Sequence, residues 1–77
     1  PGLGDISEII EINTPTIKLD QAIKKASWVG SGVEAKMIIQ DGQVLLNDEV
    51  CLMRGKQLKD GDVVRWEDET FQIKEVE

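Results

Sequence analysis

The sequence contains no histidine and no tyrosine, and its single cysteine is Cys51. Without histidine, the chain lacks the side chain that most often acts as acid or base near neutral pH. A catalytic Cys–His pair and a zinc site with histidine ligands are therefore excluded. One thiol cannot form an internal disulfide, which fits a reducing cytoplasm. We expect a protein that is not an enzyme and that holds neither a metal nor a cofactor.

Long apolar runs are also missing. No stretch approaches the roughly 20 residues that a membrane-spanning helix needs, and we expect no secretory leader. The chain has 77 residues, of which 40% are hydrophobic and 31% charged, and this composition is typical of a water-soluble protein. Its length suits one small domain, in which most apolar residues must serve the core.

The net charge of −6 is unevenly distributed. Residues 1–17 carry three acidic side chains and no basic one, for a charge of −3. Residues 18–59 carry seven basic and five acidic side chains, for +2, whereas residues 60–77 carry two basic and seven acidic ones, for −5. Because the local field steers a polyanion more than the total charge does, the central cations outline a candidate surface. Scattered solubilising lysines are the alternative interpretation.

Apolar spacing predicts an α+β domain in which two short helices pack on a small antiparallel β-sheet. The predicted helices cover residues 18–27 and 32–41. The predicted strands cover residues 6–13, 43–47, 50–53, 63–67 and 70–76. Turns are expected at 48–49, 60–61 and 68–69. We expect the charged C-terminal strand to lie beside the N-terminal one.

Each helix prediction rests on a specific signal. The first helix has one apolar stripe, formed by Leu19, Ala22, Ile23 and Ala26. Gly30 can supply the left-handed residue with which a helix often ends. The second helix begins with a predicted capping box, in which the Ser31 hydroxyl accepts from the Glu34 N–H and the Glu34 carboxylate accepts from the Ser31 N–H.

The order of these features resembles the S4 domain, an RNA-binding module named after a small-subunit ribosomal protein. The resemblance rests on three stretches, KLDQAI (18–23), SGVEAKMIIQDGQVLLND (31–48) and GKQLKDGDVV (55–64). Each stretch is a weak signal alone, but their order and spacing together are specific. The matching positions are Lys18, Leu19, Asp20, Ser31, Gly32, Glu34, Ala35, Lys36, Ile38, Ile39, Gly42, Val44, Leu46, Asn47, Asp48, Gly61 and Asp62.

The resemblance implies one domain over residues 1–77. Its parts would be an N-terminal strand and connector (1–16), an S4 core (17–66) and a C-terminal strand (67–77). The amino-acid sequences of these motifs look most like those of the small stand-alone bacterial S4-domain proteins. In the family, a helix-turn-helix-like pair of helices and the following hairpin form the RNA face. Gly32 replaces a family arginine here, although the stand-alone group commonly has glycine there, and Asn47-Asp48 replaces Asn-Gly.

The resemblance implies an RNA-binding site that consists of Lys18, Lys24, Lys25, Ser31, Gly32, Lys36, Asn47, Arg54 and Lys56. Lysines and arginines in such a site contact phosphates. Ser31 and the backbone amide of Gly32 stand at a helix N-terminus, which favours an anion. The alternatives are solvated lysines on helix surfaces, a plain N-cap at Ser31, and an asparagine that only forms a turn at Asn47.

The two tryptophans have two interpretations each. Trp28 can stack on an unpaired base, which contributes about 1–3 kcal/mol where it happens. A tryptophan beside a helix end more often covers the edge of the core, and we favour packing for both Trp28 and Trp66. Cys51 is interpreted as an apolar filler.

Three functional hypotheses follow. The first is a non-catalytic, monomeric, cytoplasmic domain that binds structured ribosomal RNA or ribosomal particles through phosphate and shape contacts. The second is a protein-interaction domain whose acidic ends dock on a basic partner such as a ribosomal protein. The third and weakest is an enzyme that acts on RNA. A contiguous positive face favours the first hypothesis, whereas cations neutralised by neighbouring acids favour the second.

Overall fold

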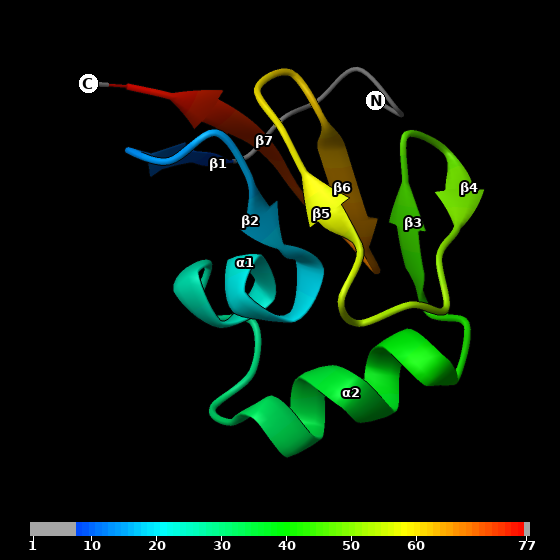
Figure 1. Ribbon diagram of the computed structural model, residues 1–77. Helices are drawn as coiled ribbons and strands as arrows, with labels where there is room; N and C mark the ends of the chain where they lie inside the picture. Colours follow the sequence, from blue (N-terminus) through cyan, green and yellow to red (C-terminus); the bar gives the residue numbers. More distant parts are fainter. Residues whose placement is uncertain (1–7, 77) are drawn as a thin grey trace.

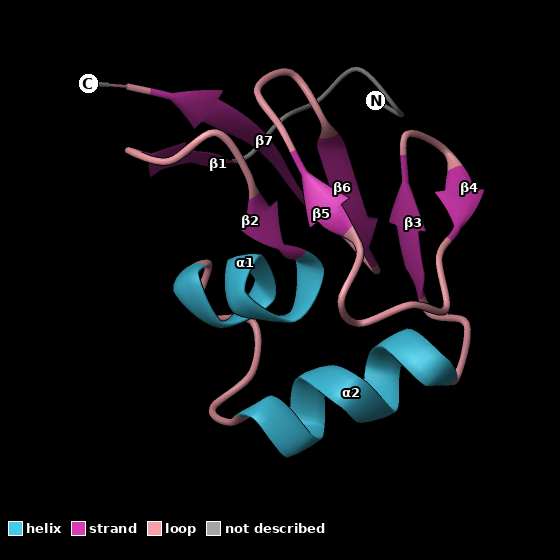
Figure 2. Cartoon of the chain, in the orientation of Figure 1, coloured by secondary structure: helices cyan, strands magenta, loops and turns pink. Residues whose placement is uncertain are grey.

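The computed structural model describes residues 8–76, which form two helices and seven strands (Figures 1 and 2). The helices are α1 (Leu19–Lys25) and α2 (Gly32–Gln40). The strands are β1 (Glu8–Ile12), β2 (Ile17–Lys18), β3 (Val44–Leu46), β4 (Glu49–Val50), β5 (Gln57–Leu58), β6 (Val63–Trp66) and β7 (Glu69–Glu75). Two short helices with a sheet confirm the predicted α+β class. Among residues 8–76, neither helix has the length and apolar character to cross a membrane.

The main sheet has the strand order β1-β7-β6-β3-β4. As expected, the C-terminal strand lies beside the N-terminal one, but β1 pairs with β7 in parallel while the other pairs are antiparallel. A parallel pair requires a long crossover connection, and most of the domain separates these two strands. The sheet is therefore mixed, not purely antiparallel as predicted. The predicted first strand began at Ile6, which lies outside the described residues.

A second sheet of two strands, β2 and β5, was not predicted. The first predicted helix includes Lys18, and the sequence pattern predicts no strand between residues 53 and 63, yet Lys18 pairs with Gln57 in antiparallel register. Strands of two residues are too short to show the alternation by which a strand is recognised in a sequence. This pairing holds the start of α1 next to the 54–56 loop.

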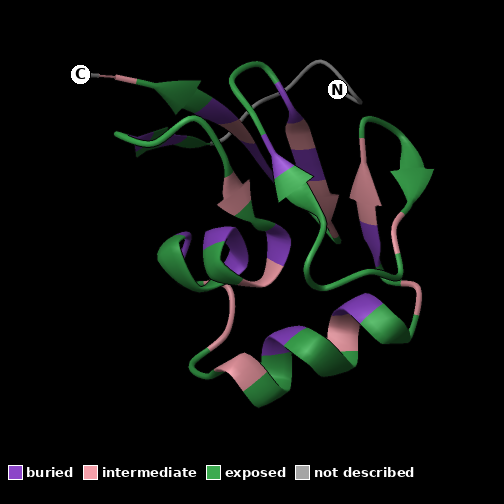
Figure 3. Cartoon of the chain, viewed as in Figure 1, coloured by how far each residue is buried: buried purple, intermediate pink, exposed green. Residues whose placement is uncertain are grey.

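The core lies between the two helices and one face of the main sheet. Figure 3 shows the buried side of each helix turned toward the strands. The predicted stripe of α1 is buried throughout, and α2 buries Ala35 and Ile39. The sheet contributes Ile10, Ile12, Val44, Val64, Phe71 and Ile73. Phe71 and Ile73 thus share a buried face, as their alternation predicted.

Four local predictions need correction. The left-handed residue after α1 is Ser27, with φ 64°, and not Gly30. The β3–β4 turn is formed by Asn47 (φ 51°) and Asp48 (φ 71°), one residue before the predicted position. Two successive positive φ values match a two-residue hairpin turn, for which asparagine at the first position is favoured. The β6–β7 turn is also shifted by one residue, to 67–68, and the strand predicted at 50–53 ends at Val50.

Candidate nucleic-acid interface

Three predicted cations meet at the start of α1. Lys18 ends β2 and offers no side-chain cap to the helix. Instead, the Leu19 N–H donates to the Lys56 carbonyl over 2.9 Å, and the Asp20 N–H donates to the Arg54 carbonyl over 3.1 Å. The 54–56 loop therefore satisfies two of the amides that a helix start leaves free. These contacts and the Lys18–Gln57 pairing bring the backbone of residues 54–56 near Lys18, and the side chains of all three cations are exposed.

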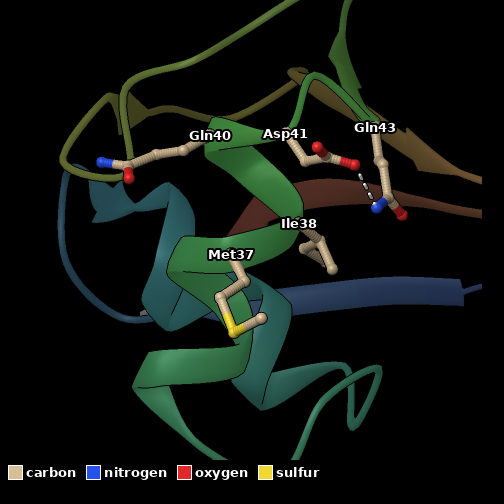
Figure 4. A pocket seen from close by; sticks show the side chains of 5 residues that line it. All are labelled: Met37, Ile38, Gln40, Asp41 and Gln43. Atoms are coloured by element: carbon tan, nitrogen blue, oxygen red, sulfur yellow. Dashed lines mark hydrogen bonds between the residues drawn. The ribbon is translucent and has the colours of Figure 1, made fainter.

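Lys36 lies on the flank of α2 that faces this loop. It follows the buried Ala35 and is therefore turned by about 100° from the core side, on the same flank as Gln40 one turn later. Figures 1 and 4 place the loop between β4 and β5 over the second half of α2, with Gln40 directed toward it. We call the four residues Lys18, Lys36, Arg54 and Lys56 the basic cluster.

The start of α2 combines a cap with free amides. The Ser31 hydroxyl accepts from the Glu34 N–H over 3.3 Å, as predicted. The Glu34 carboxylate accepts from the Gly30 N–H over 2.8 Å, and not from the Ser31 N–H as expected. Among residues 8–76, the N–H groups of Gly32 and Val33 have no hydrogen-bond partner. These two donors can still receive an anion, but the Glu34 carboxylate lies close by.

The other predicted residues are set apart from the basic cluster. Lys24 and Lys25 are exposed in the last turn of α1, where a cation also interacts favourably with the helix dipole. Asn47 lies in the β3–β4 turn, which Figure 1 shows at the far end of the sheet from α1. The structure therefore gathers part of the predicted set and leaves Asn47 distant from the rest.

Asn47 takes part in a polar network that links the β3–β4 turn to the start of β6. Its amide oxygen accepts from the Val63 N–H over 3.0 Å, and its amide nitrogen donates to Asp62 over 3.2 Å. Asp62 is 7% exposed and also accepts from the Lys59 N–H over 2.9 Å. Burial raises the pKa of Asp62, but the hydrogen bonds from the Lys59 N–H and the Asn47 amide and the charge of the Lys59 ammonium outweigh it, so the pKa lies below its ordinary value. The geometry favours the turn-forming interpretation of Asn47.

None of the four cations of the basic cluster forms an ion pair with a described residue. Among residues 8–76, the one ion pair joins Lys59 to Asp62 at 3.5 Å. The acid-rich strand β1 and the end of β7 lie at the opposite end of the molecule from α2 (Figure 1). The molecule extends 33 × 29 × 20 Å, whereas salt at 0.15 M screens charges over about 8 Å. One acid, Asp20, lies beside the basic cluster, since its N–H donates to the Arg54 carbonyl, but its carboxylate forms no ion pair with the four cations.

The tryptophans pack as expected, although both remain partly accessible. The Trp28 ring lies 4.7 Å from Phe71 and 5.7 Å from Trp66, measured between ring centroids. Cys51 also packs against the core, as predicted. Sequence reasoning did not anticipate that Trp28 and Trp66 line a common hollow beside α2. The two residues are far apart in the sequence, and no periodicity connects them.

Comparison with known proteins gives two findings. A family model described as S4 domain matches residues 10–74. The probable ribosome maturation protein RlbA of Bacillus subtilis (strain 168) is 43% identical over 58 residues, which cover 75% of this chain and 82% of that protein. The matched region contains both helices, the 54–56 loop and the network around Asp62.

Proposed function

Since this chain belongs to the S4 domain family, we propose that it is a non-catalytic RNA-binding domain that contacts structured ribosomal RNA or ribosomal particles. The RNA would be held through its phosphates and its shape, with little reading of base edges. Lys18, Lys36, Arg54 and Lys56 would make the central contacts. Lys24, Lys25 and the α2 start at Ser31 and Gly32 would extend the surface.

The observation that carries this proposal is the exposure of the basic cluster without acidic partners. A lysine held in an ion pair would have to give up that pair before it could bind a phosphate. The four cations of the cluster have no such pair among the described residues. They also come from the end of β2, from α2 and from the 54–56 loop, which hydrogen bonds and packing hold together, so little ordering is needed when RNA binds.

The relative supports the choice of a ribosomal target. It is described as a probable ribosome maturation protein, and it is 43% identical to this chain over 58 residues. Ribosomal RNA in its particles presents structured helices whose phosphates a preformed basic surface can contact. Such a target would place this protein in the cytoplasm.

The test is a titration of structured ribosomal RNA fragments at about 50 and 200 mM salt, because each released counterion adds to the salt dependence of binding. Lys36→Glu should weaken binding about tenfold, since a hydrogen bond to a charged group contributes about 1.5–3 kcal/mol. The slope of log affinity against log salt should also become shallower by about 0.7 to 0.9.

Lys74→Glu is the matched control, because Lys74 is exposed on β7 and the substitution changes the net charge by the same amount. It should weaken binding much less than Lys36→Glu. Equal losses in the two variants would show that only the overall charge matters and would refute the assigned face. An absence of binding at the lower salt would refute the function itself.

A further inference from the structure

A hollow of about 240 Å³ lies beside α2. It is lined by Trp28, Val29, Glu34, Met37, Ile38 and Trp66. Past Met37 and Ile38 it continues into a more open depression that Gln40, Asp41 and Gln43 border (Figure 4). We call the two together the aromatic groove.

The hollow between the two tryptophans and the basic cluster lie on different flanks of α2, whereas Gln40 of the adjoining depression lies on the flank of Lys36. Glu34 and Ile38 are one turn apart and share the flank that lines the hollow. Lys36 and Gln40 share the other flank, and Figure 4 shows Ile38 and Gln40 directed to different sides of the helix. A ligand in the hollow would therefore leave the Lys36 flank free.

The Trp66 ring is held so that its face, not its polar edge, is available to a ligand. Its indole N–H donates to the Gln43 amide oxygen over 2.9 Å. The Gln43 amide nitrogen in turn donates to the Asp41 carboxylate over 2.9 Å. With its donor satisfied, Trp66 offers the negative face of an aromatic ring, and Trp28 adds a second ring, tilted by 38° to the first.

Three acidic residues lie in or next to the aromatic groove. Glu34 lines the hollow and Asp41 borders the adjoining depression. Glu69 is paired directly with Trp66 across β6 and β7, so both side chains project from the same face of the sheet. All three acids are exposed, and neither lining contains a lysine or an arginine.

We propose that the aromatic groove binds an arginine or lysine side chain of a basic segment in a protein partner. A cation over an indole face is attracted by the ring, and neighbouring carboxylates pair with the same charge. Arginine fits best, because its planar guanidinium stacks on aromatic rings and pairs with carboxylates at the same time. The carboxylates disfavour a phosphate here, so this site is separate from the proposed RNA surface and does not depend on it.

The two tryptophans make the test direct, because the chain has two tryptophans and no tyrosine. A synthetic Arg-Gly repeat peptide of about ten residues would be titrated against the full chain while tryptophan emission is followed, since both fluorophores line the proposed site. We expect a saturable change in emission. A Glu-Gly peptide of equal length should cause none.

Three variants locate the site. Glu34→Gln keeps an acceptor for the Gly30 N–H, and Glu69→Gln keeps the side-chain shape. Each variant should weaken peptide binding about threefold to fivefold, because it removes one of several carboxylate charges near the bound cation. Glu11→Gln, at an exposed position of β1, is the control and should leave binding unchanged. Thermal unfolding of each variant verifies that the fold is retained.

Equal peptide affinity in Glu34→Gln, Glu69→Gln and Glu11→Gln would overturn the proposal, and so would an unchanged tryptophan emission. Ribosomal RNA fragments that alter the emission more than the peptide does would instead identify a base-stacking site and also overturn it. Lys36→Glu should weaken RNA binding and leave peptide binding unchanged. Glu69→Gln should weaken peptide binding and leave RNA binding unchanged. Failure of one proposal is thereby distinguished from failure of the other.

Discussion

Two sets of charged residues occupy positions of the same family pattern, but the structure surrounds them differently. Asp62 is buried and accepts hydrogen bonds from the Lys59 N–H and the Asn47 amide. Lys18 and Lys36 are exposed and have no acidic partner among residues 8–76. Asp62 therefore stabilises the fold, whereas Lys18 and Lys36 are available to a ligand. A family motif therefore mixes structural and binding residues, and local contacts separate the two.

The largest effect is expected at the buried set. Asp62→Ala removes an acceptor from the Lys59 N–H and the Asn47 amide, and it should lower the free energy of unfolding by about 2–3 kcal/mol. Lys59→Ala keeps the backbone N–H and removes only an exposed ammonium, so it should cost less than about 1 kcal/mol. Urea unfolding of both variants measures the difference. Equal destabilisation would mean that the ion pair, not the backbone hydrogen bond, holds Asp62.

A gain of binding is expected at the exposed set. A Cβ atom at Gly32 would meet no other atom within 4 Å, so Gly32→Arg can restore the guanidinium of the family pattern without a clash. One added phosphate contact should raise RNA affinity about tenfold, which corresponds to the lower end of a charge-assisted hydrogen bond. Gly32→Ala adds the Cβ atom without the charge and should leave affinity unchanged. A similar gain in both variants would assign the effect to helix stability.

The smallest effect is expected from pH. Because the pKa of Asp62 in the folded protein lies below its ordinary value, ionised Asp62 stabilises the fold at pH values above its unfolded pKa of about 3.9. This contribution is lost as the pH falls through the unfolded and then the folded pKa. The difference in stability between the natural chain and Asp62→Asn should therefore shrink from pH 6 toward pH 3. A difference that grows on acidification would contradict the assigned direction.

The predictable part of the fold came from periodic patterns. The Leu19–Ala26 stripe and the alternation of Phe71 and Ile73 each follow a regular period, and both are buried as predicted. The pairing of β2 with β5 and the parallel partner of β1 depend on contacts between distant parts of the chain, for which the sequence carries no local signal. The one-residue shift of the β3–β4 turn follows from backbone conformation, because Asn47 and Asp48 both adopt positive φ.

The candidate site was predictable as a set of residue types but not as a surface. Lys36 and Lys18 were identified through the family resemblance, and the sequence alone did not show that Arg54 and Lys56 would lie beside Lys18. That proximity comes from carbonyl groups that cap α1, and backbone groups are the same in every sequence. The polar contacts of Asn47 were equally hidden, since they join two turns of the sheet.

The most direct test of the central claim is nuclear magnetic resonance of the ¹⁵N-labelled chain during titration with a structured ribosomal RNA fragment. If the basic cluster is the RNA face, the amide signals of residues 18–20, 32–37 and 54–57 should shift most, and those of 9–12 and 72–75 should stay nearly constant. Shifts that concentrate on β1 and β7, with the 54–57 signals unchanged, would contradict the account.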